Sequence, residues 1–177
     1  MSRSNVKVAV LAIALIACGG TPDRPTVVSV RAWSASGVAE RATGTIVPDG
    51  RVLTVEHVLA GARRVEVDGR VATVVRRDPE LDLAELRSDV TGPPVRYGEA
   101  DGDLRVLTPR GARPATLNRR VNVHFAGTPG RRPSLDLAAK IVAGDSGAPV
   151  VDREGRIVGV VYARSTRREA AYAVRVP

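Results

Sequence analysis

The sequence predicts an all-β fold, built as barrels or as a sandwich. Short runs rich in valine recur roughly every 8–12 residues, and turn residues separate them. No stretch shows the apolar period of a long amphipathic helix. Aromatic residues make up only 3% of the chain, so valine, leucine, isoleucine and alanine must form the core, and valine favours strands over helices.

The first half of the predicted fold contains two strong turn signals. The Pro-Asp-Gly sequence at 48–50 predicts a turn, and the Asp-Gly pair at 68–69 predicts the tight turn of a hairpin. A polar loop is expected over 35–41, and one short helical turn over 56–60 carries His57. The expected strands are 27–33, 43–47, 52–54, 64–67, 70–76 and 83–87.

A Gly-Pro-Pro sequence at 92–94 divides the chain into two units. Two prolines after a glycine interrupt any hydrogen-bonded ladder, so a crossover is expected here between an N-terminal unit, 26–91, and a C-terminal unit, 92–177. A further turn is predicted at 152–155. The expected strands of the second unit are 104–107, 120–125, 134–137, 148–151, 157–162 and 171–174.

The first 17 residues have the pattern of a secretion signal. Arg3 and Lys7 precede an apolar run over 8–17, which is too short for a membrane span, since a helix needs about 20 residues to cross a bilayer. The segment ends Leu-Ile-Ala-Cys, which resembles the bacterial lipobox, where the signal is cut before a cysteine that carries a lipid. Cys18 is therefore the expected lipidation site, and 18–25 is its tether. The alternative is an ordinary secretion signal with an unrelated cysteine.

The charge of the chain raises the question of a nucleic-acid partner. Removal of residues 1–17 takes away two basic residues and no acidic ones, which leaves 25 basic and 19 acidic side chains, a net charge of +6. The arginines are scattered, no aromatic stacking surface accompanies them, and an export signal carries the chain away from DNA. We therefore expect no nucleic-acid partner.

A lipid on Cys18 predicts a location in the cell envelope, at the outer membrane or the periplasmic face. With a single cysteine, no intramolecular disulfide can form.

A serine between glycines, in the sequence Gly-Asp-Ser-Gly at 144–147, is the strongest chemical signal in the chain. Glycines permit positive φ angles and let a substrate approach the backbone closely. They also allow successive N–H groups to point at one spot, as an oxyanion hole requires. Because Ser146 alone is a weak nucleophile, the turn predicts a general base and an orienting acid elsewhere.

His57 and Asp82 are the candidates for the base and the acid. They precede Ser146 in the order His, Asp, Ser, which is the order of the chymotrypsin arrangement. The second histidine, His124, has no comparable context and is expected to be structural. Asp82 lies between two leucines, which indicates partial burial, whereas the rival acid Asp78 precedes a proline and is expected to be a turn residue.

Four segments together resemble the trypsin-like serine peptidases, most closely the bacterial HtrA-type (Do-like) branch. These segments are 43–47, 53–58, 82–86 and 144–149, and the resemblance extends from about 42 to 176. It implies two six-stranded antiparallel β-barrels with an active site in the cleft between them. The chain also departs from the family pattern. Its stretch between Asp82 and Ser146 is short, which predicts a shortened second barrel, and no PDZ domain is expected after that barrel.

The resemblance implies a role for each site residue. His57 would take the proton of Ser146 as the serine attacks a carbonyl carbon, and Asp82 would fix the histidine tautomer. The N–H groups of Gly144 and Ser146 would hold the oxyanion, and no metal or organic cofactor is required. Asp145 would pair with an arginine, since a lipidated N-terminus offers no free amine.

The implied function is that of a serine endopeptidase, anchored in the cell envelope, that cleaves proteins or peptides through an acyl-enzyme. Two alternatives stay open: a catalytically idle trypsin-like lipoprotein that serves as a binding or scaffold module, and an esterase that uses the same three residues. Lys140 and Arg164, near the expected primary pocket, either favour acidic side chains of the substrate or point to solvent.

Overall fold

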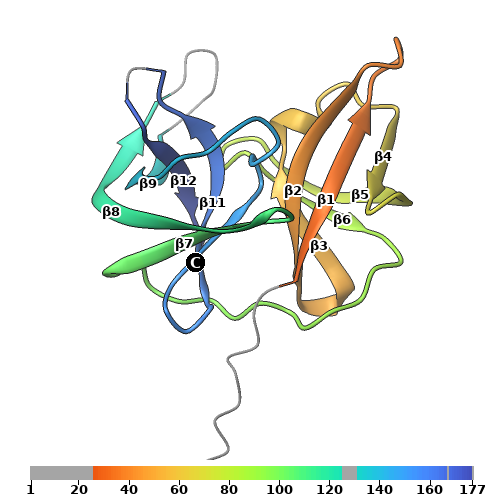
Figure 1. Cartoon of the computed structure of the whole chain (residues 1–177). Coiled ribbons are helices and arrows are strands. Elements are labelled where there is room, and N and C mark those ends of the chain that lie inside the picture. Colours follow the sequence, from red (N-terminus) through yellow and green to blue (C-terminus); the bar gives the residue numbers. More distant parts are fainter. Residues whose placement is uncertain (1–25, 125–130, 167, 177) are drawn as a thin grey trace, which may run out of the picture.

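The chain folds into two closed antiparallel β-barrels of six strands each, with almost no helix (Figure 1). This arrangement is seen in a computed structural model, which describes residues 26–124, 131–166 and 168–176. The prediction of an all-β double barrel is confirmed. The proposed signal, the tether and Cys18 lie outside the described residues.

The first barrel has the strand order β1-β2-β3-β6-β5-β4. Its strands are β1 (Val27–Trp33), β2 (Ala39–Val47), β3 (Arg51–Val55), β4 (Arg64–Val67), β5 (Arg70–Asp78) and β6 (Leu83–Arg87). Two single 3₁₀ turns flank β3, namely η1 (Pro48–Gly50) and η2 (His57–Leu59). Asp68 and Gly69 both have positive φ, as the predicted two-residue hairpin turn between β4 and β5 requires.

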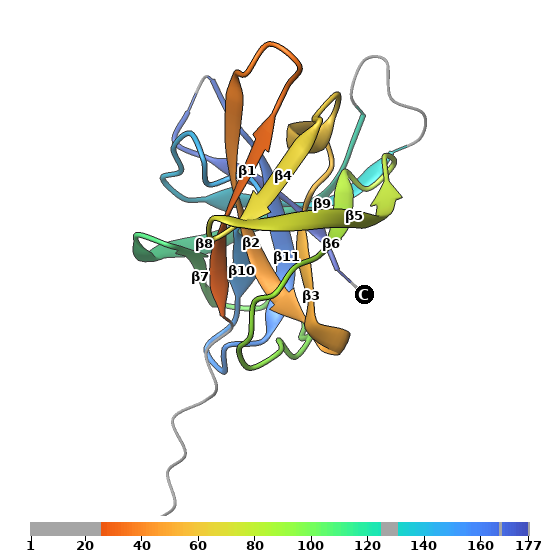
Figure 2. The ribbon, with the colours of Figure 1, turned by 90° about the vertical axis from the view of Figure 1, so that its right-hand side faces the viewer.

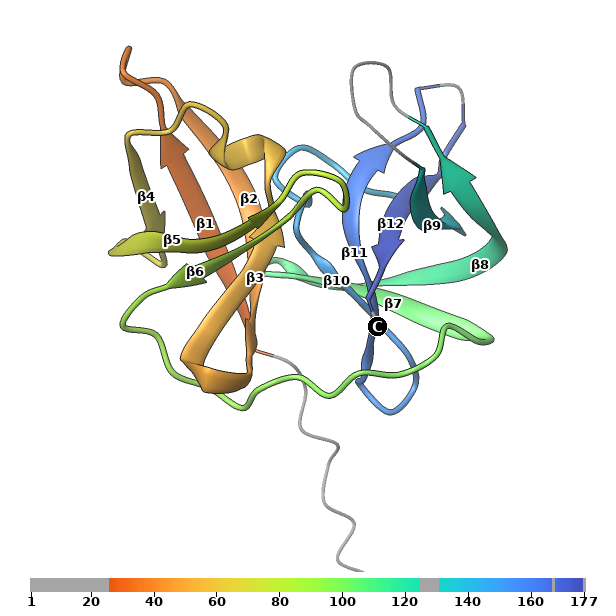
Figure 3. The same cartoon turned by 180° about the vertical axis from the view of Figure 1, so that it is seen from behind.

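The second barrel has the strand order β10-β11-β12-β9-β8-β7. Its strands are β7 (Asp103–Thr108), β8 (Gly111–Val123), β9 (Arg132–Ala138), β10 (Pro149–Val151), β11 (Ile157–Arg164) and β12 (Ala171–Arg175). A segment without strands joins β6 to β7 and runs along one end of both barrels, where the sequence predicts the crossover (Figure 3).

Two sequence predictions of local structure were incomplete. The polar loop over 35–41 is shorter than expected, because β2 already starts at Ala39. Strand β8 begins at Gly111, nine residues before the predicted strand. Pro114 argues against a strand in the sequence, so this first part of β8 was not predicted. A proline is tolerated there because residues 111–115 pair only with β7 and have no partner strand on the other edge.

The hydrophobic core continues from one barrel into the other. Val52 and Leu86 of the first barrel belong to the same buried cluster as Val160 and Val174 of the second. A second cluster, which contains Leu135, lies within the C-terminal barrel. Figure 2 looks onto the first barrel, with β4 and β5 in front of the second-barrel strands β9 and β11. The continuous core fixes the position of the strands that meet between the barrels.

Within the described residues, no helix is long and apolar enough to cross a membrane.

Candidate active site

His57 and Asp82 meet because β3 and β6 are neighbouring antiparallel strands. Val55 at the end of β3 lies opposite Leu83 at the start of β6, so the residues just beyond the two strands are adjacent. The His57 ring nitrogen Nδ1 lies 2.7 Å from Asp82 Oδ2, and the backbone N–H of His57 donates to Oδ1 at 2.8 Å. The carboxylate thus holds both the backbone and the ring of the histidine.

Asp82 is buried and adopts an unusual backbone conformation. Its side chain is about nine-tenths covered, and its φ of 57° lies in the left-handed region that side-chain-bearing residues rarely adopt. The backbone N–H of Glu56 donates to the Asp82 carbonyl at 3.1 Å. Together with the two hydrogen bonds to His57, this contact supports a conformation that costs on the order of 1 kcal/mol.

The rival residues lie elsewhere. Asp78 accepts a hydrogen bond from the Leu81 N–H at 2.9 Å, as a turn residue does. His124 lies just after β8, on the exposed surface of the second barrel. The structure therefore pairs His57 with Asp82 and not with Asp78.

The turn that carries Ser146 is hydrogen-bonded to the first barrel. The Thr43 N–H donates to the Ser146 carbonyl at 2.7 Å, and Thr43 Oγ1 donates to the Gly144 carbonyl at 2.8 Å. Thr54, on the same strand as Val55, donates from Oγ1 to the Thr43 carbonyl at 2.8 Å. These bonds place the serine turn against β2 and β3, close to the end of β3 where His57 follows.

The backbone around the serine has donors that face no protein acceptor. Gly144 and Gly147 have φ angles of 90° and 85°, which glycine alone adopts without strain. In the part of the chain that the structure describes, neither the Gly144 N–H nor the Ser146 N–H donates a hydrogen bond to another residue. Two such donors beside a serine can receive developing negative charge.

A family model for the trypsin-like peptidase domain matches residues 42–160, which include His57, Asp82 and Ser146. The chain belongs to the trypsin-like peptidase family. It is 30% identical over 159 residues to serine protease Rv3671c of Mycobacterium tuberculosis, a match that covers 78% of this chain and 40% of that protein. The crystal structure of the active form of Rv3671c protease superposes with a TM-score of 0.77 at 28% identity, covering 99% of this chain and 88% of that one.

A second relative comes from the HtrA-type proteins. The chain is 31% identical over 142 residues to a probable periplasmic serine endoprotease, described as DegP-like, of Chlamydia pneumoniae; the match covers 69% of this chain and 28% of that protein. The chain thus spans well under half the length of the curated relatives that it matches.

Asp145 of this family member is paired with arginines, as the sequence analysis expected. Its carboxylate is fully buried, and Arg110 Nη2 lies 2.8 Å from Oδ1 while Arg113 Nη1 bonds Oδ2. The backbone N–H of Val142 also donates to Oδ2 at 2.8 Å. The sequence did not indicate which arginines pair with Asp145, because both come from the β7–β8 hairpin, more than 30 residues away.

Arg132 is a site residue that the sequence analysis missed. It begins β9 of the second barrel, is buried, and lies with Nη1 3.6 Å from Asp82 Oδ2. Its Nε donates to the Glu80 carbonyl at 2.9 Å, and its guanidinium lies 4.7 Å from the centre of the Tyr162 ring. Arg132 therefore links the second barrel to the loop that carries Asp82.

The electrostatics of His57 reflect these neighbours. The hydrogen bond to Asp82 raises the pKa of His57 above its ordinary 6.5, while burial and, more weakly, the positive charge of Arg132 act to lower this pKa. The hydrogen bond to Asp82 thus stabilises the protonated form of the His57 ring.

The two residues predicted near the primary pocket, Lys140 and Arg164, differ in their exposure from the nearby Tyr162. Lys140 and Arg164 are exposed, whereas Tyr162 is buried and shares a 2.9 Å hydrogen bond with Ser134 through its hydroxyl. Among the residues that the structure describes, no group of three or more histidine, cysteine or acidic side chains is placed to hold a metal ion.

Proposed function

We propose that the chain is a serine endopeptidase that hydrolyses peptide bonds in proteins or peptides. The observation that carries this proposal is the bidentate contact of Asp82 with His57, in a family member whose Gly-Asp-Ser-Gly turn is bonded to the strands beside that pair. The names of the relatives, a serine protease and a periplasmic serine endoprotease, support the same activity.

In the proposed mechanism, Ser146 is the nucleophile. Nδ1–H of His57 donates to Asp82, which leaves Nε2 free to accept the proton of the Ser146 hydroxyl as Oγ attacks the scissile carbonyl carbon. The imidazolium then gives this proton to the leaving amine as the C–N bond breaks. Water, deprotonated by the same nitrogen, cleaves the resulting ester and regenerates the serine.

The proposed oxyanion hole consists of the N–H groups of Gly144 and Ser146. The peptide between Gly144 and Asp145 is fixed because Thr43 bonds the Gly144 carbonyl and the Asp145 N–H donates to Val142 at 3.1 Å. The carboxylate of Asp145, in the same turn, is also fixed by its ion pairs with Arg110 and Arg113. Donors fixed before the reaction stabilise the oxyanion without further rearrangement.

We also propose that the chain is exported and held in the cell envelope by a lipid on Cys18. The lipobox-like sequence supports this location, as does the relative named as periplasmic. Cys18→Ser should leave an uncleaved or unlipidated precursor and release the protein from membranes, as measured by detergent partitioning. Unchanged partitioning would contradict the anchor.

Of the two alternatives, the idle scaffold is not favoured. Backbone strain of the kind seen at Asp82 is concentrated at functional sites, and the buried carboxylate is bonded to His57, so both features support catalysis over an idle scaffold. The esterase alternative uses the same residues and differs only in substrate.

A fluorophosphonate probe tests the proposal, because only an activated serine is labelled. Ser146→Ala should abolish labelling and lower peptide turnover by several orders of magnitude, and His57→Ala should do nearly as much. Asp82→Asn should cost on the order of 10⁴-fold. Asp78→Asn is the matched control and should cost little, because Asp78 serves only a turn.

Three outcomes would overturn parts of this assignment. Wild-type turnover in Ser146→Ala would remove the proposed nucleophile. Equal losses in Asp78→Asn and Asp82→Asn would remove the choice of acid. Turnover of esters without any turnover of a mixed peptide library would favour the esterase.

A further inference from the structure

A small pocket lined by arginines lies directly beside the proposed oxyanion hole. Its volume is about 200 Å³, and Gly144 and Ala143 form one wall. Arg31 of β1, Arg41 of β2 and Arg110 of the second barrel line it as well. A β-carbon placed on Gly144 would lie 3.9 Å from Cβ of Arg41, so the arginine side chain starts next to the serine turn.

The register of β1 and β2 places Arg31 and Arg41 directly opposite each other. Opposite residues of an antiparallel pair point to the same face, and like charges in such positions destabilise the sheet. Thr43, two residues beyond Arg41 and on the same face, is the residue that bonds Gly144. Both arginines therefore project from the face that meets the serine turn.

Among the described residues, these two arginines form no ion pair with a carboxylate. Glu66 lies opposite Arg31 on β4, but it pairs with Arg64. Within the described residues, neither Arg31 nor Arg41 has a carboxylate oxygen within ion-pair distance, and both are exposed. Arg110 is engaged with Asp145, yet its side chain is still 58% exposed.

We propose that this pocket binds the carboxylate of an aspartate or glutamate in the substrate, within a few residues of the scissile bond. The proposal rests on the proposed peptidase activity and names its substrate class. An acidic side chain relieves the repulsion between Arg31 and Arg41, and the adjacency to Gly144 fixes the distance of that side chain from the carbonyl in the oxyanion hole. The repulsion in the unbound protein is then a stability cost tolerated for binding.

The experiment compares peptides that carry Glu or Gln at each of the three positions on either side of the cleaved bond. For the wild-type full chain, kcat/KM should favour Glu over Gln by roughly tenfold at one of these positions, and the ratio should fall as ionic strength rises. In the Arg31→Gln/Arg41→Gln double variant the ratio should fall to about one. Arg41→Glu should invert the preference toward Lys, and Arg31→Lys/Arg41→Lys should retain a preference for Glu.

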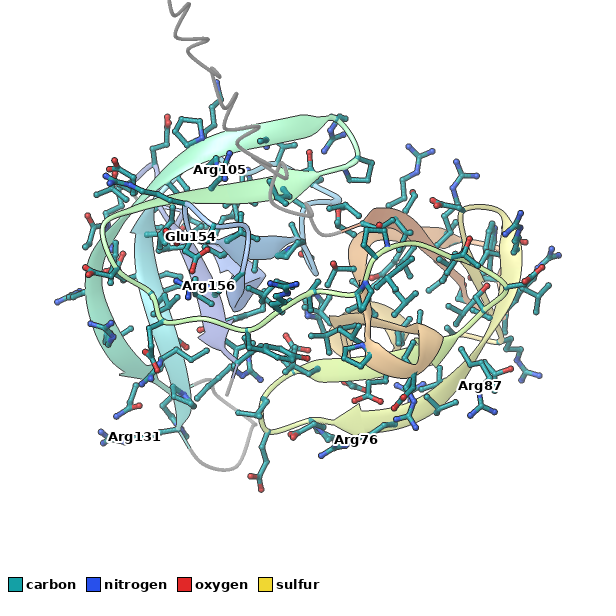
Figure 4. The ribbon with its side chains drawn as sticks, turned by 90° about the horizontal axis from the view of Figure 1, so that it is seen from below. Arg76, Arg87, Arg105, Arg131, Glu154 and Arg156 are labelled. Atoms are coloured by element: carbon teal, nitrogen blue, oxygen red, sulfur yellow. The ribbon has the colours of Figure 1, made fainter. Side chains whose placement is uncertain are left out.

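Arg87 provides the matched control. It is an exposed strand arginine of the same barrel, in register with Arg51, which in turn lies opposite Val47. Val47 is six residues from Arg41 along β2, about 20 Å away at the usual rise of a strand. Figure 4 shows Arg87 and Arg76 on the outside of the first barrel, with Arg105 and Arg131 at separate places on the second. Arg87→Gln removes the same charge and should leave the Glu to Gln ratio unchanged.

A second measurement does not depend on activity. Because Arg31 and Arg41 oppose each other without an ion-paired carboxylate, Arg31→Gln should raise the Tm by roughly 1–3 °C. Arg87 also lies opposite an arginine, Arg51, but Arg51 is ion-paired with Glu85, so Arg87→Gln should change the Tm less. An unchanged or lower Tm for Arg31→Gln would contradict the premise. Equal cleavage of Glu and Gln peptides at every position, or a preference that survives in the double variant, would overturn the proposal while the peptidase activity stands. Absence of both labelling and cleavage would instead remove the activity, and this substrate assignment with it.

Discussion

Asp82 is shared between a histidine and an arginine that come from different barrels. His57 donates a 2.7 Å hydrogen bond from Nδ1 to Asp82 Oδ2, and the Arg132 guanidinium lies 3.6 Å from the same oxygen. The arginine is also held by the carbonyls of Glu80 and Pro79, so it positions the loop that carries the acid. Arg132 is a positioning residue in this arrangement, because it acts on His57 through Asp82.

The pH dependence of turnover should report this arrangement. Only neutral His57 can accept the serine proton, so kcat/KM should fall as the pH drops through the raised pKa of His57, with a midpoint above 6.5. Arg132→Met removes a positive charge that lowers this pKa, so the acid limb should move to higher pH. Arg132→Lys should restore the wild-type midpoint in part, and the midpoint is measured from kcat/KM profiles.

Arg119→Met is the control for that shift, because Arg119 pairs with Asp136 and not with Asp82. It should leave the acid limb in place. An acid limb that does not move, or that moves to lower pH in Arg132→Met, would contradict the role given to Arg132.

The raised pKa of His57 also affects the stability of the fold. Protonated His57 stabilises the folded protein below pH 6.5, and this contribution is lost as the pH rises through the raised pKa.

At the scale of the element, the serine turn depends on one glycine for its contact with the first barrel. A β-carbon on Gly147 would lie 1.9 Å from the Thr43 carbonyl oxygen and 2.6 Å from Thr54 Oγ1, and its φ is 85°. Gly147→Ala should therefore cost more than about 3 kcal/mol in unfolding free energy or prevent folding. Urea unfolding measures the cost.

Gly61→Ala separates the clash from the backbone strain. Gly61 has a φ of 70°, but a β-carbon there meets no atom within 4 Å. Its replacement should cost only the roughly 1–2 kcal/mol of an unfavourable φ. Equal losses in the two variants would mean that the close approach of the turn to Thr43 contributes nothing.

The sequence predicts elements well where their signals are local. Strand β1 alternates buried residues with half-buried or exposed ones, and it was predicted with its observed bounds, Val27–Trp33. The first part of β8 was missed, because Pro114 and interspersed arginines hide a strand whose pairing is set by β7. The pairing of Asp145 with some arginine could be expected from the family, but the choice of Arg110 and Arg113 depends on a distant hairpin. Arg132 gave no local signal, because its neighbours Glu80 and Asp82 lie some 50 residues earlier.

At the scale of the whole molecule, the barrels share both their core and their site. One buried cluster contains residues of both barrels, and the bonds of Thr43 and Arg132 cross between them beside the proposed catalytic residues. Neither barrel can lose its structure without exposing apolar surface of the other. The chain should therefore unfold as one cooperative unit, although it is built from two closed sheets.

Trp33 makes this last expectation measurable. It is the only tryptophan and lies on β1, so its fluorescence reports the first barrel, whereas Val158 is buried in the separate cluster of the second barrel. Val158→Ala should cost about 2 kcal/mol, which corresponds to roughly 4–8 °C in Tm for a chain of this size. If the barrels unfold together, the melting curve followed by Trp33 fluorescence shifts by the same amount as the curve followed by far-UV circular dichroism. A Trp33 curve that stays at the wild-type Tm while the circular dichroism curve splits into two steps would show that the barrels unfold independently, and that the site between them can be lost while the first barrel stays folded.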